Sequence, residues 1–159
     1  MLQELKQQIV TTWQTNHNTN LLLINALSDD LLDLTLSPRG GGKIGHQLAH
    51  MYNVRFWRLE KIDKTMVSSL KSIKSGDIKT CEMLLNSHQL STHLIQQVLE
   101  NSFDNNKAKI KSFKRGLVPF LGYFIHHEAH HRGTILQILK YKKKIPAELK
   151  YGLWEWNKL

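Results

Sequence analysis

The sequence lacks the features that build disulfides, thiolate metal sites and membrane spans. Cys81 is the only cysteine among 159 residues, so no internal disulfide and no C-x-x-C motif can form. No apolar run approaches the roughly 20 residues that a membrane span needs. The first ten residues, MLQELKQQIV, are polar and amphipathic where a secretory signal would be apolar. We therefore expect a cytoplasmic protein outside the membrane, with Cys81 as a small helix residue.

Composition and charge are those of a folded protein with a basic surface. Charged residues make up 22% and hydrophobic residues 41% of the chain, and its length suits one hydrophobic core, so we predict a single domain over residues 1–159. The net charge of +9 would attract anions, including nucleic acid. The lysines are spread over 61–79, 107–115 and 140–144 without interleaved aromatics or a helix-turn-helix pattern. We expect no nucleic-acid partner.

Proline is also scarce, and its positions favour an all-helical fold. Pro38, Pro119 and Pro146 each lie at the edge of a periodic segment, where proline is tolerated, and no alternating strand pattern is present. The periodicity predicts helices over 2–27, 43–64, 79–101 and 118–141, separated by the glycine-rich loop 37–42, a basic connection and the segment 104–106. The aromatic tail, residues 146–159, predicts a short helix packed on the bundle.

Apolar residues recur at helical spacing along each predicted helix. The core candidates are Leu5, Ile9 and Trp13; Ile44, Leu48, Met51, Leu59 and Ile62; Met83, Leu84, Leu94, Ile95 and Val98; and Leu117, Phe120, Leu121, Phe124, Ile135, Ile138 and Leu139.

Four of the nine histidines lie in the single run His126-His127-Glu128-Ala129-His130-His131. The run contains two pairs spaced i,i+4, and each pair would present both imidazoles on one helical face. The apolar arc of the fourth helix includes His127 and His131, whereas His126 and His130 fall outside it. Two inward-facing imidazoles need polar partners. Neighbouring helices could form hydrogen bonds with them, or the two imidazoles could bind one shared metal ion.

A third ligand would have to come from another helix. The second helix offers His46 and His50, another i,i+4 pair, and both lie off the centre of its apolar stripe, so the pattern leaves the choice between them open. His17, His88 and His93 stand alone on other helices, and we expect each of them at the surface.

The same run matches H-E-x-x-H, the helix motif of metalloproteases in which the glutamate activates water. This interpretation is disfavoured, because no histidine follows His131 and no convincing strand is present to hold a peptide. Glu128 projects into the apolar arc, which favours a role as a hydrogen-bond partner of the ligands or of the core.

Two segments resemble the DinB/YfiT-like superfamily. They are Gly45 to Met51 and Tyr123 to Ile135, the latter with the run His-Glu-Ala-His-His-Arg-Gly, and the closing Tyr-Gly-Leu-Trp-Glu-Trp resembles the end of some members. The resemblance implies an up-down-down-up four-helix bundle. It also implies a metal bound by one histidine of the second helix and two of the fourth, here His50, His127 and His131, and so resolves the choice against His46.

The resemblance further implies a metal-dependent enzyme, a thiol S-transferase or a hydrolase. Three neutral ligands leave the ion its full charge and an open position, which can activate a thiol or water. Imidazole suits several transition metals, and we expect a divalent ion, zinc or nickel. The expected substrate is a small molecule, with a low-molecular-weight thiol as co-substrate, and the chain is expected to pair as a homodimer. The alternative is a non-catalytic stress-response or binding protein with a structural or vestigial metal.

Overall fold

Four long helices form the protein. A computed structural model describes residues 2–37, 42–104, 109–111, 113–150 and 152–159. The helices are α1 (Leu2–Asn25), α2 (Ile44–Ile62), α3 (Cys81–Asp104) and α4 (Leu117–Tyr141). Within the described ranges there is no strand, and a lone bridge joins Ile110 to Phe113. The all-α prediction is confirmed.

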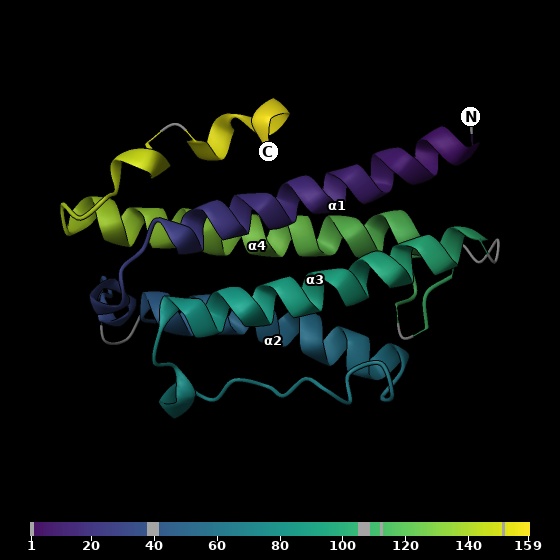
Figure 1. The fold of residues 1–159 in the computed structure, drawn as a ribbon, viewed down its shortest axis with the longest axis horizontal. Coiled ribbons are helices and arrows are strands. Elements are labelled where there is room, and N and C mark those ends of the chain that lie inside the picture. The colour runs from purple at the N-terminus through teal and green to yellow at the C-terminus, as the bar shows by residue number, and fades with distance from the viewer. Residues whose placement is uncertain (1, 38–41, 105–108, 112, 151) are drawn as a thin grey trace.

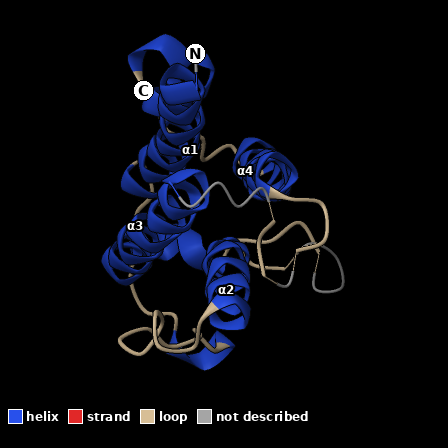
Figure 2. Cartoon of the chain, turned by 90° about the vertical axis from the view of Figure 1, so that its right-hand side faces the viewer, coloured by secondary structure: helices blue, strands red, loops and turns tan. Residues whose placement is uncertain are grey.

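The helices form an up-down-down-up bundle. In Figure 1, α1 and α4 run in one direction while α2 and α3 run in the other. Viewed end-on in Figure 2, the order around the bundle is α1, α3, α2, α4, and the packing contacts agree, because α1 and α2 each pack on both α3 and α4. The long connection from Asp63 to Thr80 allows α2 and α3 to be parallel, since it returns along the whole bundle. The fold that the resemblance implied is therefore confirmed.

The apolar core is divided into two clusters. One cluster lies where α1 ends, α2 begins and α4 ends, and the other lies at the opposite ends of the same helices. Nearly all predicted core residues are buried or packed against these clusters. Leu5 is the exception: it is 46% exposed, because it lies on the first turns of α1, beyond the residues that pack on the other helices.

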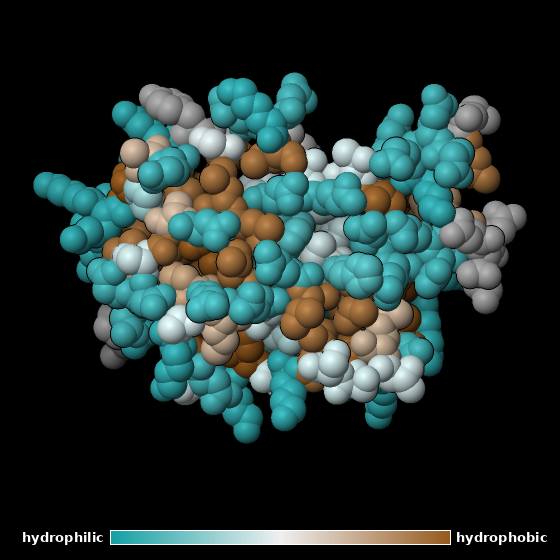
Figure 3. Space-filling model, viewed as in Figure 1, coloured by the Kyte–Doolittle hydropathy of each residue, from teal (hydrophilic) through white to brown (hydrophobic). Residues whose placement is uncertain are grey.

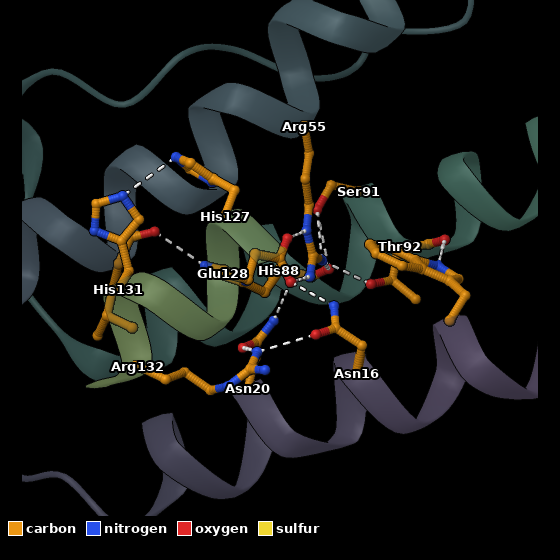
Figure 4. Close-up of polar contacts among 12 residues, drawn as sticks. Asn16, Asn20, Arg55, His88, Ser91, Thr92, His127, Glu128, His131 and Arg132 are labelled. Atoms are coloured by element: carbon orange, nitrogen blue, oxygen red, sulfur yellow. Dashed lines mark hydrogen bonds and ion pairs between the residues drawn. The ribbon is translucent and has the colours of Figure 1, made fainter. Parts of the chain in front are cut away.

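A layer of buried polar side chains lies between the two clusters. Every helix contributes to it at mid-length, and Figure 4 shows its members pointing toward one another across the bundle. Its members are Asn16 and Asn20 of α1, Arg55 of α2, His88, Ser91 and Thr92 of α3, and Glu128 and Arg132 of α4. Buried polar groups at matching levels of four helices fix how the helices align along their axes, because any slip would leave them unpaired.

The connections differ in detail from the predicted ones. The first helix ends at Asn25 and is followed by a short 3-10 helix, Asp29–Asp33. This 3-10 segment and the connection between α2 and α3 both pack closely on the start of α2. A Cβ on Gly45 would lie 3.3 Å from the Leu32 carbonyl oxygen and 3.0 Å from Ile78 Cγ2. Residues 38–41 of the predicted loop and 105–106 of the predicted third-helix end lie outside the described residues.

The tail forms three 3-10 turns and not the single short helix that was predicted. They span Ala147–Leu149, Gly152–Trp154 and Trp156–Lys158. The tail nevertheless packs on the bundle, since Leu149 and Leu153 are buried in the first core cluster and the turn at 152–154 contacts α1. A glycine within this segment suits the close packing, because a Cβ on Gly152 would approach Leu22 Cδ2 to 2.9 Å. Tyr151 lies outside the described residues.

The surface is mostly hydrophilic on the face seen in Figure 3, with smaller hydrophobic areas between the polar side chains. Of the helices in the described ranges, none combines the length and the apolar character needed to cross a bilayer.

Candidate metal centre

Three histidines converge on the edge where α2 meets α4. His127 and His131 lie one turn apart on α4, and His50 faces them from α2. The Nε2 atom of His127 is 3.2 Å from Nε2 of His50 and 3.2 Å from Nε2 of His131. One ligand atom from each of the three residues lies within 4.8 Å of the other two, so the group could hold a metal ion.

The two separations that join His127 to His50 and to His131 fit a shared ion better than hydrogen bonding. Two nitrogens that each lie about 2.0–2.1 Å from one ion are roughly 2.8 to 3.4 Å apart, for angles between a right angle and the tetrahedral angle. Both observed separations fall in this interval. Hydrogen bonding explains them less well, because the Nε2 atom of His127 carries at most one proton and has two nitrogen neighbours.

Gln47 orients His131 for this role. Its side-chain oxygen lies 3.2 Å from His131 Nδ1, and a carbonyl oxygen can only accept a hydrogen bond. The His131 proton is therefore on Nδ1, which leaves the lone pair on Nε2 directed at the other two imidazoles. Gln47 lies three residues before His50, so one face of α2 supplies both the ligand atom and the support for its partner.

The electrostatics keep the two α4 histidines neutral at pH 7. Burial lowers the pKa of His131 to about 4, with further lowering by the charges of His127 and His50. The pKa of His127 is also lowered, mainly by burial and to a smaller extent by the charge of His50. Neutral imidazole is the form that binds a metal, so both rings are ready to bind one without first losing a proton.

Glu128 faces the bundle interior and not the histidines. Its Oε1 accepts a hydrogen bond from Arg55 Nε at 2.6 Å, and its Oε2 accepts one from a second Arg55 nitrogen at 2.8 Å. The amide groups of Asn16 and Asn20 donate to the same Oε2 at 2.6 Å each. The carboxylate is fully buried and surrounded by donors, which makes it a partner of the core and leaves it no access to solvent for proton transfer.

Arg55 controls the ionisation of Glu128. Burial by itself would raise the pKa of Glu128, but the charge and hydrogen bonds of Arg55 lower it to about 2. Arg132 is buried beside them and donates to the side-chain oxygens of Asn16 and Asn20, at 3.1 and 2.6 Å. Glu128 is therefore ionised at pH 7, and it anchors α4 in the rotation that turns His127 and His131 toward α2.

Comparison with protein families agrees with this geometry. The model of the DinB family matches residues 1–142. The chain belongs to the DinB family. No curated protein and no solved structure matches it. The superfamily resemblance is confirmed.

The predicted exposure of the histidines outside the triad was correct for some of them and wrong for others. In this DinB protein, His126 and His130 are exposed, as the helical projection predicted, and the His130 ring lies beside that of His131 with centroids 5.2 Å apart. His46, the competing α2 candidate, turns away from the triad, and its Nε2 lies 2.7 Å from Ser75 Oγ. His93 is exposed as expected.

The surface prediction for His17 and His88 was wrong. His17 is only 8% exposed and His88 is fully buried, because both lie on helix faces that neighbouring helices cover: α1 packs on α3 and α4, and α3 packs on α1 and α2. Burial lowers the pKa of His17 to about 4 and that of His88 to about 3, each with a further contribution from the charge of Arg55. His88 Nε2 lies 3.0 Å from the Leu48 carbonyl oxygen, so this uncharged ring donates to α2.

The sequence reasoning missed the polar layer and Gln47. Asn16 and Asn20 continue the buried stripe of α1 that begins at Ile9 and Trp13, and they could have been flagged as polar residues at core positions. Arg55 interrupts the apolar stripe of α2 in the same way. Their partners could not have been named, because Arg55 and Glu128 are 73 residues apart in the chain.

Proposed function

We propose that His50, His127 and His131 hold one divalent metal ion, and that the protein is an enzyme of the thiol S-transferase or hydrolase type. The observation that carries the proposal is the meeting of three Nε2 atoms from two helices, two of them on neutral half-buried imidazoles. Zinc or nickel is the proposed ion, because imidazole nitrogen suits both.

The site has the open side that catalysis needs. The group of candidate ligands contains three histidines and, among the described residues, no cysteine, aspartate or glutamate that would complete a closed structural site. His50 is exposed whereas the two α4 histidines are half-buried, so a ligand can approach from solvent on the α2 side. Structural zinc sites have four protein ligands, and catalytic sites have three and an open position.

When bound, the ion would lower the pKa of a thiol or water in that open position. The protein's part is to hold the three imidazoles neutral and aligned. Gln47 sets the His131 tautomer, and the Glu128 network sets the rotation of α4.

The nucleophile is proposed to come from outside the chain. Burial, together with a hydrogen bond to Asp29 and its charge, raises the pKa of Cys81 to about 12, so its thiol is protonated at pH 7. Glu128 is enclosed by Arg55, Asn16 and Asn20 and cannot act as the base. An exogenous thiol or water is left to react.

Cobalt substitution tests the proposal. Cobalt(II) bound to the triad gives a d–d spectrum that reports on its ligands, and a small thiol such as 2-mercaptoethanol should change that spectrum if the fourth position is open. The same titration on His50→Ala protein is the control, since loss of one ligand should remove the starting spectrum. A stable cobalt spectrum that no thiol changes would reject the thiol-transferase function and favour a structural metal in a binding or stress-response protein.

A further inference from the structure

Two arginines three residues apart on α2 have opposite surroundings. Arg55 is fully buried, and its nitrogens donate to Glu128, Thr92, Ser91 and the His88 carbonyl. Arg58 is half-buried, and its contacts are with two aromatic rings: its guanidinium carbon lies 4.8 Å from the Tyr123 centroid and 5.7 Å from that of Phe113. Among the described residues, no acceptor takes a hydrogen bond from Arg58.

Aromatic contacts hold a guanidinium in place without using its donors. A cation over a ring face is attracted by the ring, while the N–H groups at the edge of the guanidinium stay available. An arginine positioned in this way has five donors arranged to bind a carboxylate with two parallel hydrogen bonds. Tyr123 and Phe113 therefore hold Arg58 in a position ready to bind an anion.

This arginine lies beside the histidine triad. Tyr123 stacks on His127 with ring centroids 5.9 Å apart and planes 13° from parallel, so one aromatic ring separates the Arg58 guanidinium from a candidate ligand. On α2, the Trp57 ring lies edge-on to His50, with centroids 6.4 Å apart, and is 44% exposed. Tyr123 thus contacts both His127 and Arg58, and Trp57, the residue before Arg58, adds a second ring beside His50.

We propose that Arg58 binds a carboxylate of the ligand whose other end reaches the triad, and that Trp57 and Tyr123 contact the part between. The inference rests on the proposed function for what happens at the metal, and it adds the class of molecule: a small organic acid with an apolar stretch between its reacting end and its carboxylate. A single carboxylate matches the single charge of Arg58, and the guanidinium can bind it with two parallel hydrogen bonds.

Two thiols that differ only in charge test this proposal. Mercaptohexanoate and mercaptohexanol have the same six-carbon chain, and one ends in a carboxylate where the other ends in a hydroxyl. Calorimetric titration of the zinc-loaded protein at low salt gives the affinity of each, whether or not the sulfur reaches the metal. We expect the carboxylate to bind about tenfold more tightly, the change that a charge-assisted hydrogen bond gives.

Arg58→Gln should remove this preference and leave the binding of mercaptohexanol unchanged. Lys61→Gln is the matched control, because Lys61 is an exposed cation on the same helix and the substitution removes the same charge. It should keep most of the preference. Equal affinities of the wild-type protein for the two thiols, or a preference that survives in Arg58→Gln, would overturn the proposal.

The cobalt spectrum separates this proposal from the proposed function. An Arg58-dependent preference in calorimetry together with an unchanged cobalt spectrum would support the carboxylate site and reject thiol binding at the metal. A changed cobalt spectrum without any preference for the carboxylate would support thiol binding at the metal and reject the carboxylate site at Arg58.

Discussion

At the scale of single residues, Glu128 shows how a buried charge is stabilised inside an apolar bundle. Its carboxylate accepts hydrogen bonds from a guanidinium and two amides, and all of these groups are buried. Taking a carboxylate and a guanidinium out of water is costly, and the cost is offset only while both partners are present. Removing one partner leaves the other charged and unpaired.

Glu128→Gln should therefore destabilise the fold strongly. The substitution keeps the size of the side chain and removes the charge that Arg55 faces, and we expect a loss of about 3 kcal/mol or more in the free energy of unfolding, measured by urea denaturation of metal-free protein. Glu155→Gln is the control: Glu155 forms an exposed ion pair with Lys158, and its loss should cost less than about 1 kcal/mol. Similar midpoints for Glu128→Gln and wild type would contradict the proposed role of the network.

Cys81 should be an unreactive thiol. With a pKa near 12 it has very little thiolate at neutral pH, and thiolate is the reactive form. We expect its reaction with an aromatic disulfide reagent at pH 8 to be at least about a hundredfold slower than that of a free small thiol. Asp29→Asn should accelerate the reaction, since it removes the nearby negative charge. A rate equal to that of the free thiol would show that Cys81 can be a nucleophile after all.

At the scale of elements, α2 and α4 each combine a buried face with a ligand-bearing edge. On α4 the periodicity of the apolar residues was enough to separate His127 and His131 from His126 and His130, because helical geometry is local. On α2 the same reasoning left His46 and His50 equivalent, and the resemblance favoured the histidine that the structure brings to the triad. The structure shows why His46 is not part of the triad: its ring lies beside Ser75, a residue of the long connection between α2 and α3.

The support that α2 gives to His131 can be tested without removing a ligand. Gln47→Ala removes the acceptor for His131 Nδ1, so the ring loses its fixed tautomer and orientation, and we expect zinc affinity to fall by about 10- to 100-fold. His46→Ala changes the neighbouring residue of the same helix and should leave the affinity unchanged. Competition with a chromophoric chelator measures both, and equal affinities for Gln47→Ala and wild type would exclude this role of Gln47.

At the scale of the whole molecule, four helices, their direction and the residues that form the apolar core could be predicted from periodicity, helix-breaking residues and the family resemblance. The polar layer could not. Whether Asn16, Arg55 or His88 lies at the surface or inside depends on which helix covers it, and the partners lie far apart in sequence. The prediction of a single helix in the tail was wrong for a related reason. The aromatic composition predicted that the tail packs on the bundle, but not that it does so through 3-10 turns. Cytoplasmic location and the homodimer stay predictions.

The buried histidines make the whole fold sensitive to acid. His17 and His88 are neutral in the folded protein, with pKa values near 4 and 3, whereas the ordinary value is 6.5. Below pH 6.5 these two histidines bind protons in the unfolded chain and not in the folded one. Their contribution to the free energy of unfolding is therefore constant above that pH and decreases below it. The decrease is about 1.4 kcal/mol per pH unit for each histidine.

Urea denaturation between pH 7.5 and 5, with a chelator present, should show this decrease in the free energy of unfolding. His17→Leu should make the decrease less steep by about 1.4 kcal/mol per pH unit, the contribution of one histidine. His93→Gln, at an exposed position, should leave the slope unchanged. Glu128 does not contribute in this range, because its pKa is lowered and its stabilising effect is lost only below pH 4.5. A free energy of unfolding that stays level down to pH 5 would contradict the burial of the two rings.

The most direct test of the account is the amount of zinc or nickel that purified, untagged protein binds after reconstitution, measured by elemental analysis. One ion per chain is expected for the wild type and for His46→Ala, whereas His50→Ala and His127→Ala should retain far less. Less than one ion per chain in the wild type, or full occupancy in His50→Ala, would contradict a metal centre built from these three histidines.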